Sequence, residues 1–236
     1  MRIWDVDPGY LSRQHLLGEH RELHGIVSII TNHKAGYARH PETLRWAEFG
    51  WALQQRHRLL ACEMRLRGYQ DRTPVTIDRN PGQWPAEYLD PPARQYGLLQ
   101  RKYAEAGTAG RIPLPTSGQT LWSQHKYSVL ARDPVEYKAI GRSLANGHGR
   151  FGREYDELAR TLVEILRKRP KPGGIRNAVQ HMWGYVSGDP SPAARELEQL
   201  SSSALLGEIQ QRAVQQGVAY LLASTALSEL MAWMEA

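Results

Sequence analysis

Six residues close to the N-terminus combine the side chains that proton transfer and anion binding require. With an advance of about 100° per residue, a helix would place all of them on one side. They are Gln14, His15, Gly18, Arg21, Glu22 and Gly25. A carboxylate and an imidazole can donate and accept protons, and a guanidinium binds phosphate or carboxylate. The stripe therefore predicts a surface for close approach rather than an ordinary solvated helix face.

The two glycines of this stripe need an explanation of their own. A glycine costs about 1 kcal/mol relative to alanine in a helix interior, so alanine would suit a merely solvated face better. Gly18 and Gly25 either let another part of the protein pack closely, with Arg21 and Glu22 as plain surface charges, or let a ligand approach the helix. The spacing alone does not separate these two interpretations.

A helix from Ser12 to about Thr31 must position these residues. Leu11 and Ser12 provide a staple residue and an N-cap, and apolar residues then recur at helical spacing. This core stripe lies beside the polar stripe and contains Leu16, Leu23, Ile26, Val27 and Ile30. The helix therefore has one face for the core and one for chemistry.

His20 and His24 stand four residues apart, as the two histidines of a zincin motif do. That motif needs glutamate directly after the first histidine, and this chain has Arg21 there. We therefore expect no metal site and no cofactor. The single cysteine, Cys62, rules out an intramolecular disulfide and a multi-cysteine zinc site. Its place in a predicted helix favours a small core residue over a reactive thiol.

The bulk properties suit a folded protein that binds nucleic acid. The chain has 236 residues, 41% of them hydrophobic and 23% charged, which is ordinary for a globular protein. No apolar run approaches a membrane span of about 20 residues, and no signal peptide is evident, so we expect a cytoplasmic protein without a membrane partner. The net charge of +6 favours a nucleic-acid partner, although many basic proteins bind none.

Helical periodicity dominates the whole chain, and short alternating segments typical of strands are scarce. The nearest candidate for a strand is "RTPVTID", and the segment "TAGRIPLPTSGQT" interrupts all periodicity. We therefore predict an all-α fold of two helical domains, residues 1–117 and 118–236. Helices are expected at 12–31, 41–68, 93–107, 121–132, 133–146, 154–169, 174–187, 192–200 and 205–234.

The first 23 residues resemble the N-terminus of the pyrimidine dimer DNA glycosylases, the endonuclease V family. The likeness lies in Arg2-Ile3, in "RQHLLGEHREL" and in "LLACEMRLRGY", and it extends more loosely through "HPETLRW" to about residue 115. The resemblance implies a compact helical domain that cleaves the glycosyl bond at a damaged pyrimidine and then nicks the strand. Its partner is damaged double-stranded DNA.

The resemblance also implies roles for particular residues. The family's nucleophile is the protein's own α-amino group. Here that group should belong to Met1, because methionine is normally retained before a residue as bulky as Arg2. Glu22 matches the glutamate that assists catalysis. The expected DNA-binding residues are Arg2, Gln14, His15 and Arg21.

The chemistry explains why a chain terminus would be used. An α-amino group ordinarily has a pKa of about 7.7 to 8.0, so roughly a third of it is the neutral nucleophile near pH 7.5. A lysine, with a pKa of about 10.4, offers on the order of 0.1%. Attack at C1′ expels the base and leaves an imine, which acidifies the C2′ proton and permits elimination of the 3′ phosphate. Glu22 is suited to the proton transfers.

One position departs from the family. Phage members carry an arginine that contacts phosphate three residues after the glutamate, whereas this chain has Gly25. Candidates to replace that contact are His20, His24, Lys34, Arg39 and the arginines after Arg45.

The second half resembles an uncharacterised helical bacterial domain through "HKYSVLA", "YKAIGRSLAN" and "NAVQHMWGY". Its polar residues either converge on a site or satisfy one another between helices, and we favour the second interpretation. These residues are His125, Lys126, Arg142, Asn177, His181 and Tyr185.

The leading hypothesis is a DNA-repair glycosylase with coupled AP lyase activity. It would act on pyrimidine dimers or a related lesion through an imine of the N-terminal amine. Two alternatives stay open. One is a non-catalytic helical module that binds nucleic acid, which the absence of an arginine at Gly25 favours. The other is a glycosylase for another modified base.

Overall fold

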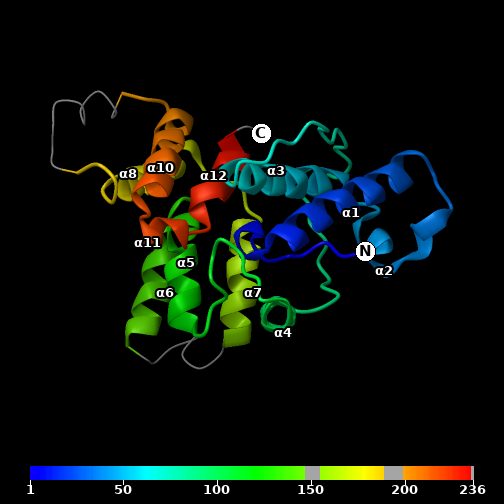
Figure 1. Cartoon of the computed structure of the whole chain (residues 1–236), viewed down its shortest axis with the longest axis horizontal. Helices are drawn as coiled ribbons and strands as arrows, with labels where there is room; N and C mark the ends of the chain where they lie inside the picture. Colours follow the sequence, from blue (N-terminus) through cyan, green and yellow to red (C-terminus); the bar gives the residue numbers. More distant parts are fainter. Residues whose placement is uncertain (147–154, 189–198, 235–236) are drawn as a thin grey trace. The chain divides into compact units, whose positions relative to one another are not determined.

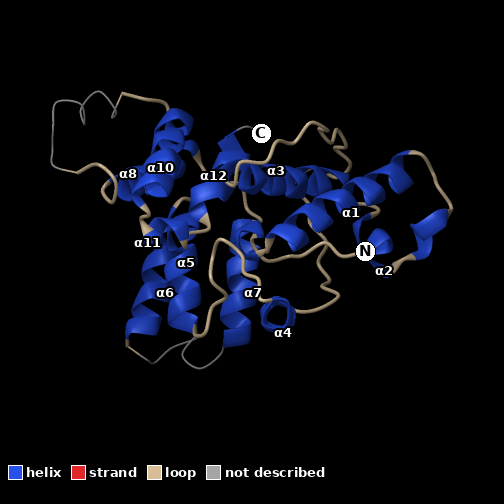
Figure 2. Ribbon diagram, viewed as in Figure 1, coloured by secondary structure: helices blue, strands red, loops and turns tan. Residues whose placement is uncertain are grey.

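The computed structural model describes residues 1–146, 155–188 and 199–234. Contacts divide the chain into two compact units, Met1–Gly110 and Arg111–Ala236. All the regular elements assigned in the described ranges are helices, so the all-α prediction is confirmed (Figures 1 and 2). The domain boundary after residue 117 stays a prediction. None of the described helices combines the length and apolar character needed to cross a membrane.

The first unit is built on α1 (Arg13–Thr31), which packs against α3 (Gly50–Leu66). Ser12 is the N-cap of α1, as predicted, and its hydroxyl oxygen accepts a hydrogen bond from the His15 backbone N–H at 3.4 Å. Leu16, Leu23 and Ile26 of the predicted core stripe are buried, which fixes the rotation of α1 about its axis. Short 3-10 turns at Pro8–Tyr10 and Gly36–Arg39 flank the helix.

The predicted helical region 41–68 is divided in two, α2 (Pro41–Trp46) and α3. Gly50 begins α3 where the later segment 77–79 crosses it, and a Cβ at Gly50 would lie 2.6 Å from Cγ1 of Ile77. The Trp51 N–H donates to the Arg79 carbonyl at 2.9 Å, so that segment also satisfies the start of the helix. At the other end Gly68 has the left-handed φ of 81° that a helix C′ position favours.

The rest of the first unit is a long irregular segment followed by α4 (Pro92–Ala106). Residues 67–91 contain no helix or strand, so "RTPVTID" is not a strand in the structure. Cys62 on α3 is buried, in agreement with its expected place in the core.

In the second unit, α5 (Gly118–Leu130) packs against four helices: α6 (Pro134–Ala145), α7 (Tyr155–Leu166), α8 (Pro172–Trp183) and α12 (Ala226–Met234). The predicted helix 205–234 is three helices, α10 (Ser202–Gln216), α11 (Ala219–Leu222) and α12. Gly217, with a φ of 64°, ends α10. The predicted helix 192–200 lies almost wholly outside the described residues.

Candidate active site

Side chains, and not a neighbouring strand, hold the extended N-terminal segment in place. Four consecutive backbone N–H groups each donate to a carboxylate or amide oxygen. The pairs are Arg2 with Glu22, Ile3 with Glu42 at 3.1 Å, Trp4 with Glu19 at 3.2 Å, and Asp5 with Gln95 at 2.8 Å. Because buried N–H groups need partners, these four acceptors determine where the chain terminus lies.

Glu19 is one of the three buried acceptors, with Glu42 and Gln95. It lies on the core side of α1, and its carboxylate also binds Arg56 of α3 through two nitrogens, at 2.7 and 2.9 Å. Burial raises the pKa of Glu19 to about 6, although Arg56 acts in the opposite direction. Arg56 donates in addition to the Val6 carbonyl at 2.9 Å. One buried ion pair thus joins α1, α3 and the N-terminal segment.

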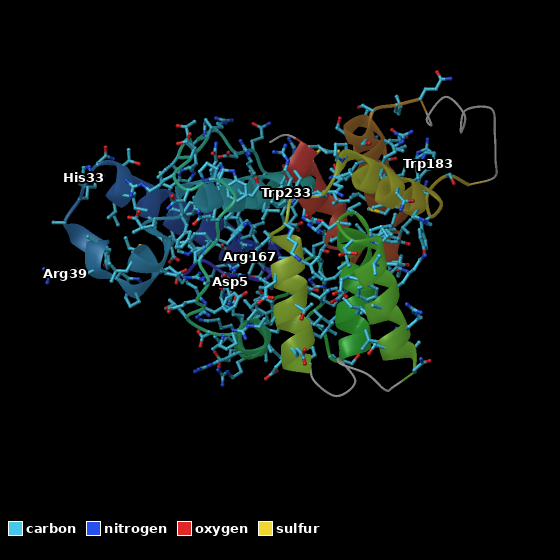
Figure 3. The ribbon with its side chains drawn as sticks, turned by 180° about the vertical axis from the view of Figure 1, so that it is seen from behind. Asp5, His33, Arg39, Arg167, Trp183 and Trp233 are labelled. Carbon is cyan, nitrogen blue, oxygen red and sulfur yellow. The ribbon has the colours of Figure 1, made fainter. Side chains whose placement is uncertain are left out.

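A second network, centred on Arg45, holds the other side of this segment. Arg45 donates to Glu42 at 2.7 Å, to Asp5 at 3.0 Å and to the Ile3 carbonyl at 3.0 Å. Trp46 adds a hydrogen bond from its indole nitrogen to Glu42 at 2.9 Å. Asp5 is labelled in Figure 3 among the side chains of the first unit. These hydrogen bonds hold residues 3 and 5, so Met1 lies at the end of a segment whose place is fixed by side-chain contacts.

The α-amino nitrogen of Met1 lies 4.0 Å from Oε1 of Glu22. The other carboxylate oxygen, Oε2, accepts the N–H of Arg2, so one side chain faces both ends of the first peptide unit. The Glu22 side chain is 39% exposed, which leaves it accessible to a ligand. The two predicted catalytic residues are therefore neighbours, as the sequence-based hypothesis requires.

A groove of about 710 Å³ opens beside Glu22. Its lining includes Arg2, Gln14, His15, Arg21 and Glu22, the predicted site residues other than Met1. Further lining residues are Trp4, Arg13, Leu17, Gly18, Glu19 and Lys102. Because Glu19 is neutralised by its buried partner, four cationic side chains face the single exposed carboxylate, and the groove suits a polyanion.

His15 is held in a fixed orientation at this groove. Its Nδ1 lies 2.8 Å from the Ser12 hydroxyl, and its ring makes edge contacts with Trp4 and Tyr103. Burial, and then the nearby charge of Lys102, lower the pKa of His15. The ring is therefore neutral near pH 7 and available as a hydrogen-bonding group.

Arg2 and Arg21 present different surfaces to the groove. The Arg2 guanidinium donates to Asp90 at 2.8 Å and lies over the Trp4 ring, 4.2 Å from its centroid. Arg21 is exposed to solvent. Arg2 is thus positioned in advance, whereas Arg21 can move toward an incoming anion.

The glycines of α1 face open space. A Cβ added at Gly18 or Gly25 would meet no described atom within 4 Å, apart from the helix's own neighbouring backbone. The described part of the protein therefore does not use these glycines for close packing. Gly18 is also part of the groove lining.

Comparison with protein families agrees with this geometry. Residues 1–77 match the model of the pyrimidine dimer DNA glycosylase family. The match covers about a third of the chain, including all of α1 and α3, and at the level of the family it supports a DNA-repair glycosylase whose partner is damaged DNA. Residues 126–229 match a separate family, a protein of unknown function (DUF1722). Both predicted resemblances are thus confirmed, the first over residues 1–77 rather than to about residue 115.

No curated protein and no solved structure matches the chain. The roles of individual residues in the glycosylase-matching part therefore rest on its own geometry.

Within the glycosylase-matching part, several proposed substitutes for the lost phosphate contact are already engaged. Arg56 is buried in an ion pair with Glu19, Arg67 binds Glu63 at 2.6 Å, and His20 lies 3.2 Å from Asp71. Two cations that the sequence did not suggest, Arg13 and Lys102, line the groove instead. Arg13 adjoins the predicted stripe in the sequence, whereas Lys102 reaches the groove from α4.

The six polar candidates of the second unit do not share one environment. His125 is buried, and its Nδ1 lies 2.8 Å from the Leu121 carbonyl of its own helix. Lys126 lies over the rings of Tyr127 and Tyr220, and Tyr185 stacks on Tyr220. The other three are exposed: Arg142, Asn177 and His181. His125 thus fits the structural interpretation.

Proposed function

We propose that this protein is a DNA-repair glycosylase with coupled AP lyase activity, acting on pyrimidine dimers or a related lesion in double-stranded DNA. The observation that carries the proposal is the placement of the Met1 amine 4.0 Å from Glu22, beside a groove lined by cations. The family match of residues 1–77 supports the glycosylase class. The lyase step and the residue roles are proposed from the local chemistry.

In the first step the neutral Met1 amine attacks C1′ of the damaged nucleotide. A C–N bond forms, and the base leaves with the electrons of the glycosyl bond and takes up a proton. Opening of the sugar ring gives an imine between C1′ and the Met1 nitrogen. A carboxylate such as Glu22 can accept the proton that the amine loses and stabilise the cationic imine.

In the second step the imine acidifies the proton on C2′. Removal of that proton sends its electron pair into a C2′–C3′ double bond, and the C3′–O bond breaks with loss of the 3′ phosphate. Glu22 is exposed enough to reach the sugar and close enough to the amine to serve both steps. Hydrogen bonds at catalytic groups commonly tighten only once substrate is bound.

The cations of the groove keep a phosphate backbone beside a carboxylate. Without them the negative charge of Glu22 would repel DNA, whereas Arg2, Arg13, Arg21 and Lys102 together outweigh it. Access to C1′ requires local unstacking of the duplex, which costs less at a lesion that already distorts the helix. Open space above Gly18 supports a close approach of the DNA backbone.

Borohydride trapping tests this proposal. Untagged protein is incubated with duplex containing one thymine dimer and reduced, and a covalent complex is expected from the imine. Glu22→Gln should lower the single-turnover nicking rate by about 10²-fold or more, the usual contribution of general acid–base catalysis. Glu48→Gln, at an exposed acid outside the groove, is the matched control and should leave the rate unchanged.

A second variant addresses the nucleophile. One extra residue before Met1 moves the free amine away from Glu22 and should abolish trapping while the protein still binds DNA. The non-catalytic alternative, which Gly25 favours, predicts a different pattern. Binding would fall with salt, no strand would be cut, and Glu22→Gln would change nothing measurable. Absence of both trapping and nicking with the untagged protein would refute the proposal.

A further inference from the structure

A cluster of three histidines and one aspartate lies in the first unit, outside the groove. We propose that His20, His24, His57 and Asp71 form a binding site for a divalent transition-metal ion of the zinc class. This proposal does not depend on the proposed glycosylase function. It revises the expectation from the sequence that the chain binds no metal.

The four side chains come from three places in the sequence and meet at one point. His20 and His24 lie one turn apart on α1, His57 lies on α3, and Asp71 lies in the irregular segment after α3. Each offers one ligand atom, and these four atoms all lie within 4.8 Å of one another. The three imidazole centroids are 4.7 to 5.1 Å apart.

Two of the distances between ligand atoms already suit tetrahedral coordination. With bonds of about 2.0 to 2.1 Å, two ligand atoms of a tetrahedral zinc site are about 3.3 Å apart. Nε2 of His20 lies 3.2 Å from Oδ1 of Asp71, and Nε2 of His57 lies 3.4 Å from Oδ2 of Asp71.

His57 supplies an independent reason to expect a ligand. The residue is 4% exposed, and its buried Nε2 makes no hydrogen bond among the described residues, although it lies 3.4 Å from Oδ2 of Asp71. An unsatisfied buried polar atom is costly and rare. Coordination to an ion at the centre of the cluster would satisfy this nitrogen.

The protonation states also suit a metal ion. Burial lowers the pKa of His57 to about 4, and burial lowers the pKa of His24 as well. Although burial by itself would raise the pKa of Asp71, hydrogen bonds from Thr73 and the neighbouring His57 and His20 keep it below its usual value. Neutral imidazoles and an ionised carboxylate are the forms that bind metal.

Thr73 fixes the carboxylate of Asp71 from behind. Its backbone N–H and its hydroxyl lie 3.1 and 3.2 Å from Oδ1, and the same hydroxyl lies 3.2 Å from Nε2 of His24. Contacts of this kind orient metal ligands in known sites. The irregular segment 71–73 is thereby ordered around the cluster.

The donor set indicates the type of ion and its role. Three imidazoles and one carboxylate suit zinc, or cobalt and nickel in its place, better than magnesium or calcium, which prefer oxygen. Four protein ligands leave no open position at a tetrahedral ion, so the site would be structural. It would join α1, α3 and the segment after α3, and so help to hold the helix that carries Glu22.

Metal analysis of the full-length protein tests the inference. The chain is produced without a histidine tag, and its zinc content after gel filtration is measured by mass spectrometry. About one zinc per chain is expected. Chelator-treated protein is then titrated with Co²⁺ alone, and the intense visible absorption of tetrahedral Co²⁺ should appear and saturate at one equivalent.

Two variants identify the ligands. Asp71→Asn keeps an oxygen for Thr73 and should fold, yet it should weaken Co²⁺ binding about tenfold or more. His57→Ala should lose the absorption band. His181→Ala removes an exposed histidine on α8 and is the matched control, with unchanged binding. Because the Co²⁺ titration uses the wild-type chain, it decides the matter even if His57→Ala does not fold.

Two results would overturn the inference. One is wild-type protein without bound zinc that also shows no tetrahedral Co²⁺ band. The other is Co²⁺ binding that Asp71→Asn and His57→Ala leave as strong as in the His181→Ala control. In either case the cluster would be a hydrogen-bonded structural group around Asp71 only.

Discussion

Arg56 in the first unit and Arg132 in the second are both buried, and each binds a glutamate through two nitrogens. Arg132 also donates to the carbonyls of Ser128, Leu166 and Lys168, so its pair with Glu229 joins helix ends to α12. Arg56 and its partner instead bind backbone groups of the N-terminal segment. The same type of buried ion pair thus joins helices in the second unit and holds the N-terminal segment in the first.

The buried histidines of the two units differ in a similar way. His125 has a hydrogen-bonding partner within its own helix, whereas Nε2 of His57 makes no hydrogen bond among the described residues and lies in a cluster with His20, His24 and Asp71. Burial is nearly complete at both, and it lowers the pKa of both residues to about 4. Burial of a histidine therefore does not by itself indicate a ligand site. A buried ring nitrogen that makes no hydrogen bond is the feature that points to one.

The largest expected effect comes from breaking the two arginine pairs. Arg56→Met and Arg132→Met should each cost about 3 to 5 kcal/mol in the free energy of unfolding, because a buried glutamate is left without its partner. Urea denaturation measures this loss. At a temperature where both variants are folded, Arg56→Met should also reduce borohydride trapping, whereas Arg132→Met should not. Equal trapping by the two variants would remove the distinction drawn between the units.

Acid should destabilise the second unit through His125. The unfolded histidine binds a proton below about pH 6.5 and the folded one only below about pH 4, so the unfolded state holds more protons between these values. Stability should therefore fall as the pH drops through this window, by about 3 kcal/mol at pH 4. His125→Leu should flatten the dependence, as measured by denaturation at several pH values, and His181→Gln should not.

Alanine at the glycines of the first unit gives a smaller effect. Gly18→Ala and Gly97→Ala should each raise the free energy of unfolding by up to about 1 kcal/mol, since both glycines lie in helices and face open space. Gly18→Ala alone should weaken binding to dimer-containing duplex, because its methyl group enters the groove. Unchanged affinity would mean that the DNA does not approach α1 at this residue.

The smallest expected effect is on the salt dependence of DNA binding. Arg21→Gln should lower the slope of log affinity against log salt by about 1, the value for one lost phosphate contact. Arg160→Gln, at an exposed arginine on α7 of the second unit, is the control. A slope that falls equally in both variants would place the DNA footprint over both units rather than in the groove.

Local features of the fold were predictable from the sequence. Ser12 as N-cap, the buried stripe of α1 and Gly68 at the end of α3 each depend on residues a few positions apart. The break at residues 47–49 was not predictable, since it depends on Ile77 and Arg79 crossing the start of α3. The candidate site follows the same rule: its residues on α1 were found, and Lys102 on α4 was not.

The acceptors that hold the N-terminal segment show most clearly what could not be predicted from the sequence. Glu19, Glu42 and Gln95 look like ordinary polar residues in three helices, and only the fold brings them to consecutive N–H groups. His57 and Asp71 likewise give no sign that they meet the histidine pair of α1.

The sequence by itself determined the helical class, the polar stripe of α1 and the family resemblance, because helical periodicity, capping and a contiguous motif are local. Only the tertiary structure decided that the Met1 amine lies beside Glu22, and that three histidines and an aspartate converge. Those arrangements depend on contacts between residues far apart in the chain. They are selected by burial and by the need to satisfy each buried polar atom, which no local pattern encodes.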